Sequence, residues 1–185
     1  MFRHPSLILC LIAITTLRLP GQQSQTIRKP LSKPTDIQGY PCAKGYAWFY
    51  IDGHLDRCFV SREIPFGEAT IPAGSEIALT PDGTPEMVQM NRDTEIRSYR
   101  CAGGGWLGVA EGPMTSFYPN GKLKECFLAS DQPVQGVPCS HGGFWITAFH
   151  GDPSVKFRSN GILASCKLSK DFGSRRKGER FQQAQ

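Results

Sequence analysis

The segments FYPNGKLKECFLASD (residues 117–131) and KFRSNGILASCKLSKD (residues 156–171) carry one pattern forty residues apart. In both, aromatic residues precede an Asn-Gly pair, Leu follows the Gly by two residues, Cys by five and Asp by ten. An Asn-Gly pair between alternating runs is the strongest short-range signal for a β-hairpin, because both central residues of a type I′ turn need a positive φ. The pattern therefore predicts a β-hairpin in each segment.

The same pattern occurs four times along the chain. The turn glycines are Gly53, Gly83, Gly121 and Gly161, the fifth positions after them are Cys58, Val88, Cys126 and Cys166, and the tenth positions are Glu63, Asp93, Asp131 and Asp171. A second phrase precedes each copy: IQGYPCAKG (37–45) matches VQGVPCSHG (134–142) well, IRSYRCAGG (96–104) less well and FGEATIPAG (66–74) least. A fixed period of this kind indicates a repeat protein, here with four units in residues 36–171.

The residues around the turns alternate in polarity, which predicts one buried and one mostly wet face of a sheet. No stretch shows helical apolar spacing, and 14 Pro and 20 Gly favour many short strands and turns. The predicted fold class is all-β, with tandem β-hairpin repeats that form a mostly antiparallel, elongated single sheet stapled by disulfides.

The two ends of the chain differ from the repeats in composition. Residues 1–20 contain a short charged start and an apolar run of signal-peptide length, which is too short to span a bilayer. Residues 21–35 are polar with two prolines and are expected to be a flexible linker, and residues 172–185 are expected to be a disordered basic tail. The formal charge of +5 then belongs to the ends, since residues 36–169 hold eleven basic and fourteen acidic residues. No nucleic-acid-binding face is expected.

Six cysteines remain beyond the leader, and an even number in an exported chain indicates disulfides. The second unit lacks both cysteines and carries Ile71 and Val88 in their places. Bonds within units leave no orphan thiol, whereas bonds between neighbouring units would. We therefore predict the pairs Cys42–Cys58, Cys101–Cys126 and Cys139–Cys166. No two of these cysteines lie closer than 13 residues, which disfavours zinc knuckles.

The segments SFYPNGKLKECFL (116–128) and KFRSNGILASCKL (156–168) resemble the MORN-type repeat variant whose copies read aromatic-aromatic-x-Asn-Gly-Lys-Leu-Lys. The resemblance fades in the first unit and is weak in the second. It implies a chain of β-hairpins in one elongated sheet that serves in interaction or scaffolding, with activity in other domains. This chain departs from the family pattern in its longer unit and its cysteine pair.

The candidate binding residues come from the insertions and the tryptophans. Units three and four are lengthened at the same place, with Glu111 and Pro113 in one insertion and His150 and Asp152 in the other. Insertions at one place in a repeat project from one face, often the binding face. Trp48, Trp106 and Trp145 recur in the three units that carry cysteines. They could form aromatic platforms for sugars, but packing on each unit's disulfide is the favoured interpretation.

The tenth-position acids are expected to accept backbone N–H groups in turns. No catalytic motif is recognised, so no catalytic residue, metal or cofactor is assigned. We expect an exported module, periplasmic or extracellular, that binds a protein or a cell-envelope glycan, with no nucleic-acid partner and no membrane span. The alternatives are a glycan-binding module built on the three tryptophans and a hydrolase that uses His141 or His150 with a nearby acid.

Overall fold

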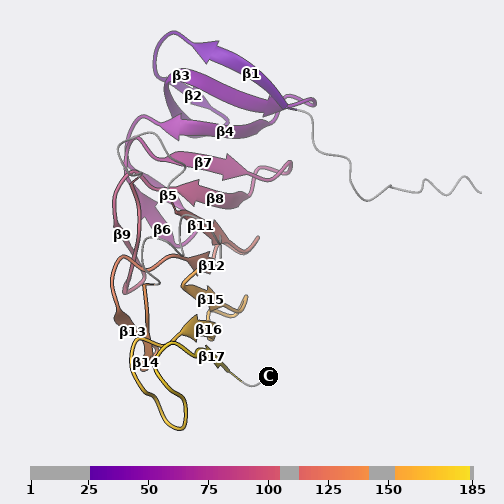
Figure 1. Ribbon diagram of the computed structural model, residues 1–185. Coiled ribbons are helices and arrows are strands. Elements are labelled where there is room, and N and C mark those ends of the chain that lie inside the picture. The colour runs from indigo at the N-terminus through magenta and orange to yellow at the C-terminus, as the bar shows by residue number, and fades with distance from the viewer. Residues whose placement is uncertain (1–25, 105–112, 142–152, 184–185) are drawn as a thin grey trace, which may run out of the picture.

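A computed structural model describes residues 26–104, 113–141 and 153–183 of the chain, and over these residues it is all-β, with no helix. The predicted fold class is confirmed: hairpins follow one another along an elongated, antiparallel main sheet (Figure 1). Within the described residues no helix is long and apolar enough to cross a membrane.

The main sheet has 11 strands in the order β1-β3-β4-β7-β8-β11-β12-β15-β16-β17, with β2 paired to β3 beside this path. The strands are β1 (Thr26–Leu31), β2 (Thr35–Ile37), β3 (Tyr40–Tyr50), β4 (Leu55–Val60), β7 (Glu76–Leu79), β8 (Pro85–Gln89), β11 (Met114–Phe117), β12 (Leu123–Cys126), β15 (Val155–Phe157), β16 (Leu163–Lys167) and β17 (Arg180–Gln182). Each unit supplies one hairpin to the sheet, so each repeat of the sequence adds two neighbouring strands.

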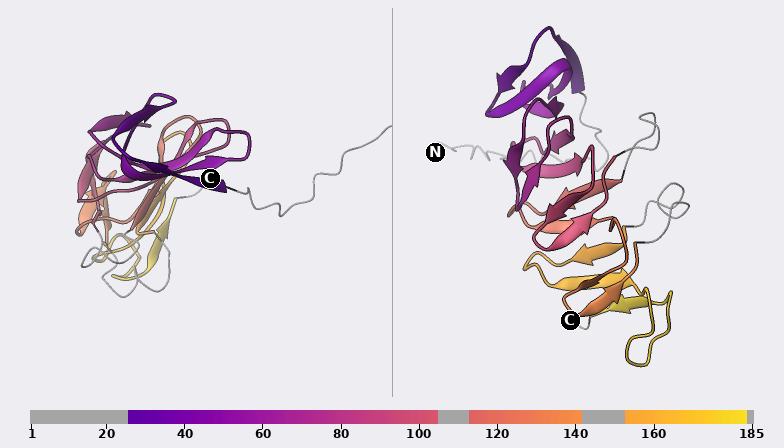
Figure 2. Two further views of the ribbon diagram at one scale, coloured as in Figure 1. Left: turned by 90° about the horizontal axis from the view of Figure 1, so that it is seen from above. Right: turned by 90° about the vertical axis from the view of Figure 1, so that its left-hand side faces the viewer.

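The phrase that precedes each hairpin forms a small hairpin of its own, and these lead-in hairpins build a second layer. The strands β5 (Ile64–Phe66), β6 (Ala69–Ile71), β9 (Thr94–Ile96) and β10 (Tyr99–Cys101) form a 4-stranded sheet, and β13 (Gln132–Val134) pairs with β14 (Val137–Cys139). Figure 2 shows these short strands stacked beside the main sheet along its length. One face of the main sheet is thus covered by the lead-in hairpins of units two to four, whereas the lead-in strand of the first unit, β2, pairs with β3.

The core lies between the two layers, where aromatic side chains join consecutive units. Phe66 of β5 packs edge-on against Phe117 of β11 with ring centroids 5.5 Å apart. Tyr99 of β10 stacks on Phe157 of β15 at 5.4 Å. Because these pairs connect the lead-in of one unit to the hairpin of the next, burial of about 150–250 Å² per aromatic side chain also holds the units in register.

The structure contains the disulfides Cys42–Cys58, Cys101–Cys126 and Cys139–Cys166, which confirms the predicted pairing. Each bond joins a lead-in hairpin to the main-sheet hairpin of its own unit. In the second unit, Ile71 and Val88 occupy the equivalent positions and are 0% and 1% exposed. Two aliphatic side chains therefore replace the bond in that unit.

Both ends of the described chain differ from what the sequence suggested. The expected linker contains β1, which pairs with β3 from Thr26↔Tyr50 to Leu31↔Gly45. The expected disordered tail contains β17, which pairs with β16, and a bridge between Phe172 and Arg175. Polar composition misled the prediction because an edge strand has few buried side chains and is stabilised chiefly by its backbone hydrogen bonds.

Candidate functional site

The face of the main sheet turned away from the lead-in layer carries a continuous row of side chains, which we call the outer row. The strand register places in it Trp48, Arg57, Ala78, Met87, Ser116, Glu125, Lys156, Ser165 and Gln182. Their neighbours along the strands, such as Ala47, Cys58 and Val88, are buried in the core. Alternation along each strand explains this division, since successive side chains point to opposite faces.

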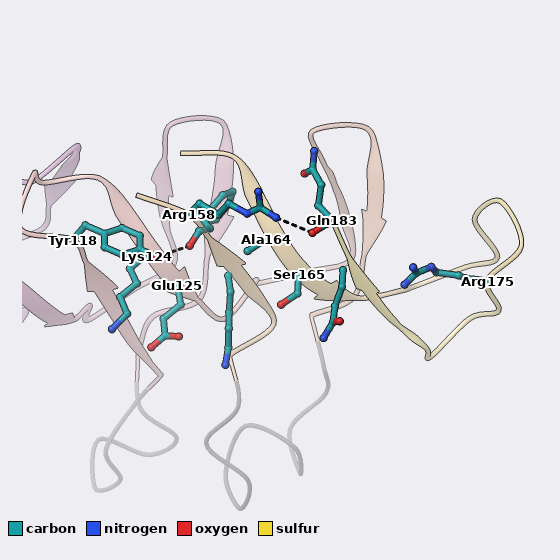
Figure 3. A pocket seen from close by; sticks show the side chains of 11 residues that line it. Tyr118, Lys124, Glu125, Arg158, Ala164, Ser165, Arg175 and Gln183 are labelled. Atoms are coloured by element: carbon teal, nitrogen blue, oxygen red, sulfur yellow. Dashed lines mark hydrogen bonds between the residues drawn. The ribbon is translucent and has the colours of Figure 1, made fainter. Parts of the chain in front are cut away.

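An open hollow of about 690 Å³ lies on this face at the C-terminal end of the sheet (Figure 3). We call it the basic groove. Its cationic lining residues are Lys124, Lys156, Arg158 and Arg175, and its other polar residues include Tyr118, Glu125, Ser165, Gln182 and Gln183. Four elements contribute the cations: β12, β15, the turn after β15 and the loop before β17. Consecutive units and the C-terminal strand therefore build the groove together.

Hydrogen bonds to backbone carbonyls fix the walls of the basic groove. The Arg158 guanidinium donates to the carbonyl of Gln183 at 2.8 Å, and the Tyr118 hydroxyl donates to the carbonyl of Phe157 at 2.8 Å. Arg175 donates to the carbonyl of Arg180 at 2.9 Å. The single carboxylate of the lining, Glu125, accepts from the Ser116 hydroxyl at 3.0 Å. A carbonyl partner orients a guanidinium without cancelling its charge.

The N-terminal end of the same face is electrostatically balanced instead. Arg57 pairs with Asp56 at 3.0 Å, and Asp56 is only 5% exposed. The Tyr50 hydroxyl donates to the carbonyl of Leu79 at 2.7 Å. Burial, with the nearby Asp56 carboxylate, raises the pKa of Tyr50 to about 12. This cluster is a satisfied structural network, so Arg57 offers little uncompensated charge to a ligand.

Trp48 lies in the outer row, half-buried, opposite Arg57 in the register. Its neighbour Ala47 pairs with Cys58 and is buried. The expected packing of this tryptophan on its own disulfide is therefore wrong, because the two side chains project from opposite faces of the sheet. Tyr46, 47% exposed, lies near it under the Arg28 guanidinium at 4.3 Å. Trp106 and Trp145 lie outside the described residues.

The insertion residues Glu111, His150 and Asp152 also lie outside the described residues. Pro113 is described, half-buried, directly before β11. The next residue, Met114, is 44% exposed and lines a small hollow on the outer face with Met87 and Gln89. In the third unit, the chain that follows the insertion thus places Met114 on the outer face of the main sheet.

In three of the four units the tenth-position acid accepts a backbone N–H, as expected, but from a residue six to ten positions further on and not within a local turn. Asp93 accepts the backbone N–H of Gly103 at 3.1 Å, Asp131 that of His141 at 2.9 Å, and Asp171 that of Lys177 at 2.8 Å. The His141 N–H, followed by the His141 ring, holds the pKa of Asp131 below its ordinary value. The Lys177 N–H and then the Arg176 guanidinium do the same for the pKa of Asp171. In the first unit, Glu63 instead lies 4.0 Å from Arg92.

His141 does meet an acid, as the hydrolase alternative requires: its Nδ1 lies 2.6 Å from Asp131 Oδ1. The nearby Ser154 hydroxyl donates to the carbonyl of His141 at 3.0 Å, so its proton is directed to the backbone. Since Asp93 and Gly103 make the same backbone bond without a histidine, the contact belongs to the repeated turn. His150 is not among the described residues. No group of three or more potential metal ligands gathers in the described part of the chain.

Sequence analysis missed the basic groove. Lys124, Lys156 and Ser165 occupy outward positions of predicted hairpins, but Arg158 and Arg175 depend on turns and on β17. One signal was available: residues 153–183 hold eight basic and two acidic residues. That excess of positive charge was assigned to a disordered tail, whereas the pairing of β17 with β16 places this part of the chain at the main sheet.

Comparisons with known proteins returned no relative: the chain matches no protein-family model, no curated protein and no solved structure. The MORN-type resemblance of residues 116–128 and 156–168 accordingly stays a prediction. What the described residues offer chemically is a long polar face with a cationic hollow at one end and an aromatic pair at the other.

Proposed function

We propose that this chain is an exported, non-catalytic repeat module that binds a protein or a cell-envelope partner through the outer face of its main sheet. The single observation that carries the proposal is the outer row, which runs across nine strands and is covered by no other element among the described residues. With about 4.8 Å between strands, the full sheet offers a face about 40 Å long.

The inner face of the main sheet packs against the lead-in layer and is buried in the core. Strands β1 and β17 are the two edge strands of the sheet, each paired on one side among the described residues. Repeat proteins commonly use one extended face for recognition, because each repeat contributes the same few positions to it. The outer row places side chains of nine neighbouring strands side by side.

Export is supported by cysteine usage and by the predicted signal segment. Three disulfides are consistent with an oxidising compartment, since thiols in the cytosol are kept reduced. Residues 1–20, predicted to be the signal peptide, lie outside the described residues. The MORN-type resemblance agrees with an interaction role.

Paired surface variants test the proposal. Ala78→Arg places a long cation in the middle of the outer row, and Thr70→Arg adds the same side chain at an exposed site on β6. Each variant carries a photo-crosslinker, and adducts with envelope fractions are compared with wild type. We expect Ala78→Arg to lose the adducts and Thr70→Arg to keep them, with equal melting temperatures. Adducts retained by Ala78→Arg would reject the outer face as the binding surface.

A second candidate, neutral-glycan binding through an aromatic platform, is favoured by the position of Trp48 on the outer face beside the exposed Tyr46. A chain with Trp106→Phe and Trp145→Phe isolates the fluorescence of Trp48. Quenching by iodide that oligosaccharides relieve would support this function. Blue-shifted, quencher-resistant emission would mean a buried indole and would reject it.

A further inference from the structure

The basic groove differs from the rest of the outer face in charge, shape and construction. We propose that it binds an acidic polysaccharide, whose carboxylate or sulfate groups contact Lys124, Lys156 and Arg175. The inference rests on the proposed function, since it names the ligand class for one end of the same face.

The charge of the folded chain is concentrated at this end. Between residues 153 and 183 the basic residues are Lys156, Arg158, Lys167, Lys170, Arg175, Arg176, Lys177 and Arg180, and the acidic ones are Asp171 and Glu179. The other described residues, 26–104 and 113–141, hold eleven basic and twelve acidic residues. A surface potential of one sign in a concave site raises the local concentration of a ligand of the opposite sign.

Two of the four cations of the groove, Lys124 and Arg175, have no carboxylate partner among the described residues. Lys124 is exposed and makes no ion pair with any described residue. Arg175 donates to the carbonyl of Arg180 and lies 5.6 Å from the centre of the Phe181 ring. These two contacts hold the guanidinium in place without neutralising its charge. Glu125, the one carboxylate in the lining, accepts from the Ser116 hydroxyl and keeps its charge, so the lining holds four cationic side chains and one anionic side chain. Guanidinium and ammonium groups around one hollow match anions spaced along a chain.

The neutral lining favours a sugar chain over a nucleic acid. Gln182 and Gln183 place two amides between the cations, and amides both donate to and accept from sugar hydroxyls. Single-stranded nucleic acids instead stack their bases on exposed aromatic rings. The tyrosine of the lining, Tyr118, is half-buried with its hydroxyl bound to the carbonyl of Phe157. A hollow of about 690 Å³ has room for a few sugar rings.

The test measures binding of the full chain to polygalacturonate, which is carboxylated, to dextran sulfate, and to neutral dextran. We expect both acidic chains to bind, with affinity that falls as salt rises, and dextran to give no signal. The double variant Lys124→Glu/Arg175→Glu should bind about tenfold or more weakly, which corresponds to about 1.4 kcal/mol or more. The matched control Lys33→Glu/Lys44→Glu makes the same change of net charge at exposed sites near the N-terminal end of the sheet, and its affinity should fall less than about twofold.

Three results would overturn the inference. They are an equal loss in the control variant, no binding of either acidic polysaccharide by wild type, and tighter binding of a single-stranded oligonucleotide or of phosphatidylglycerol vesicles than of the polysaccharides. If the double variant has a lower melting temperature than wild type, the binding measurement is repeated with Lys124→Gln, which alters one exposed side chain. If polysaccharide binding fails while Ala78→Arg still abolishes envelope adducts, the inference is wrong and the proposed function stands. If adducts survive in Ala78→Arg, the proposed function itself is wrong.

Discussion

At the scale of single residues, a side-chain clamp explains why the lead-in phrase repeats Gln-Gly. Gln38 accepts the N–H of Leu55 at 2.9 Å and donates to the carbonyl of Gly53 at 3.2 Å. Gln135 does the same for Leu163 at 3.0 Å and Gly161 at 2.8 Å. The amide thus completes the turn of the hairpin below it. Sequence reasoning saw the repeated glutamine but could not assign it, because its partner lies in the other layer.

Gly67 lies in the lead-in phrase that matches the others least, and the close approach of the two layers still requires glycine there. It has a φ of 61°, and a Cβ there would lie 2.5 Å from the carbonyl oxygen of Gly121 and 2.8 Å from the Phe117 ring. Gly39 also has a positive φ, 88°, but a Cβ would meet nothing within 4 Å. Both alanine variants bear the backbone cost of about 1–2 kcal/mol, and only Gly67→Ala adds a clash of about 1–3 kcal/mol. Urea unfolding should rank Gly67→Ala clearly below Gly39→Ala, and equal losses would contradict the close approach of the two layers.

The turn acids give a pH dependence whose sign is fixed. The pKa of Asp131 is lowered in the folded state, first by the His141 N–H and then by its ring. The folded protein therefore releases this proton more readily than the unfolded chain, so the carboxylate stabilises the fold above the ordinary pKa of about 4. That contribution disappears as pH falls through the folded pKa. We expect Asp131→Asn to be less stable than wild type at pH 7 and to approach it at pH 2–3, measured by urea unfolding across pH. A constant difference between the two proteins would contradict this account.

At the scale of elements, the Asn-Gly hairpins were predicted correctly and their turn type was not. Asn120 and Asn160 are not among the residues with positive φ, whereas Gly121 and Gly161 are. Each pair ends a type I turn followed by a bulge, and the Asn side chain accepts the N–H two residues on, at 3.2 Å to Lys122 and 3.0 Å to Ile162. Two-residue turns with positive φ at both centres occur in the lead-ins instead, at Gln38-Gly39 and Gln135-Gly136. Glutamine is not a typical residue for that turn, so propensity alone could not find it.

The disulfides are the element-scale feature that the sequence predicted fully, because the second unit shows which positions pair. That unit also supplies the matched replacement, Ile71 and Val88. Cys139→Ala/Cys166→Ala should lose the loop constraint, worth about 3 kcal/mol, and leave a cavity. Cys139→Ile/Cys166→Val loses the constraint but fills the space, so its loss of unfolding free energy should be smaller by about 1–3 kcal/mol. The melting temperatures of the two variants test this expectation. Equal melting temperatures would contradict the equivalence of the Ile71/Val88 positions and the disulfide positions.

At the scale of the whole molecule, the repeat predicts a stack of units but not how the stack ends. The C-terminal segment repeats part of a unit: the Phe172–Arg175 bridge encloses Gly173, with a φ of 59°, in the manner of a lead-in turn, and β17 then pairs with β16. A bare β16 would leave a row of unpaired backbone groups, which is a template for pairing with other chains. Neither feature shows in apolar periodicity, since the segment buries few side chains and its pairing partner is set by the unit before it.

Removal of residues 172–185 tests this cap. The shortened chain loses the hydrogen bonds between β17 and β16 and the Phe172–Phe181 contact, whose centroids are 6.1 Å apart. We expect a lower melting temperature and concentration-dependent self-association in sedimentation velocity, because the exposed edge of β16 is free to pair. A shortened chain that stays monomeric and has the melting temperature of wild type would show that β17 does not protect the edge of the sheet.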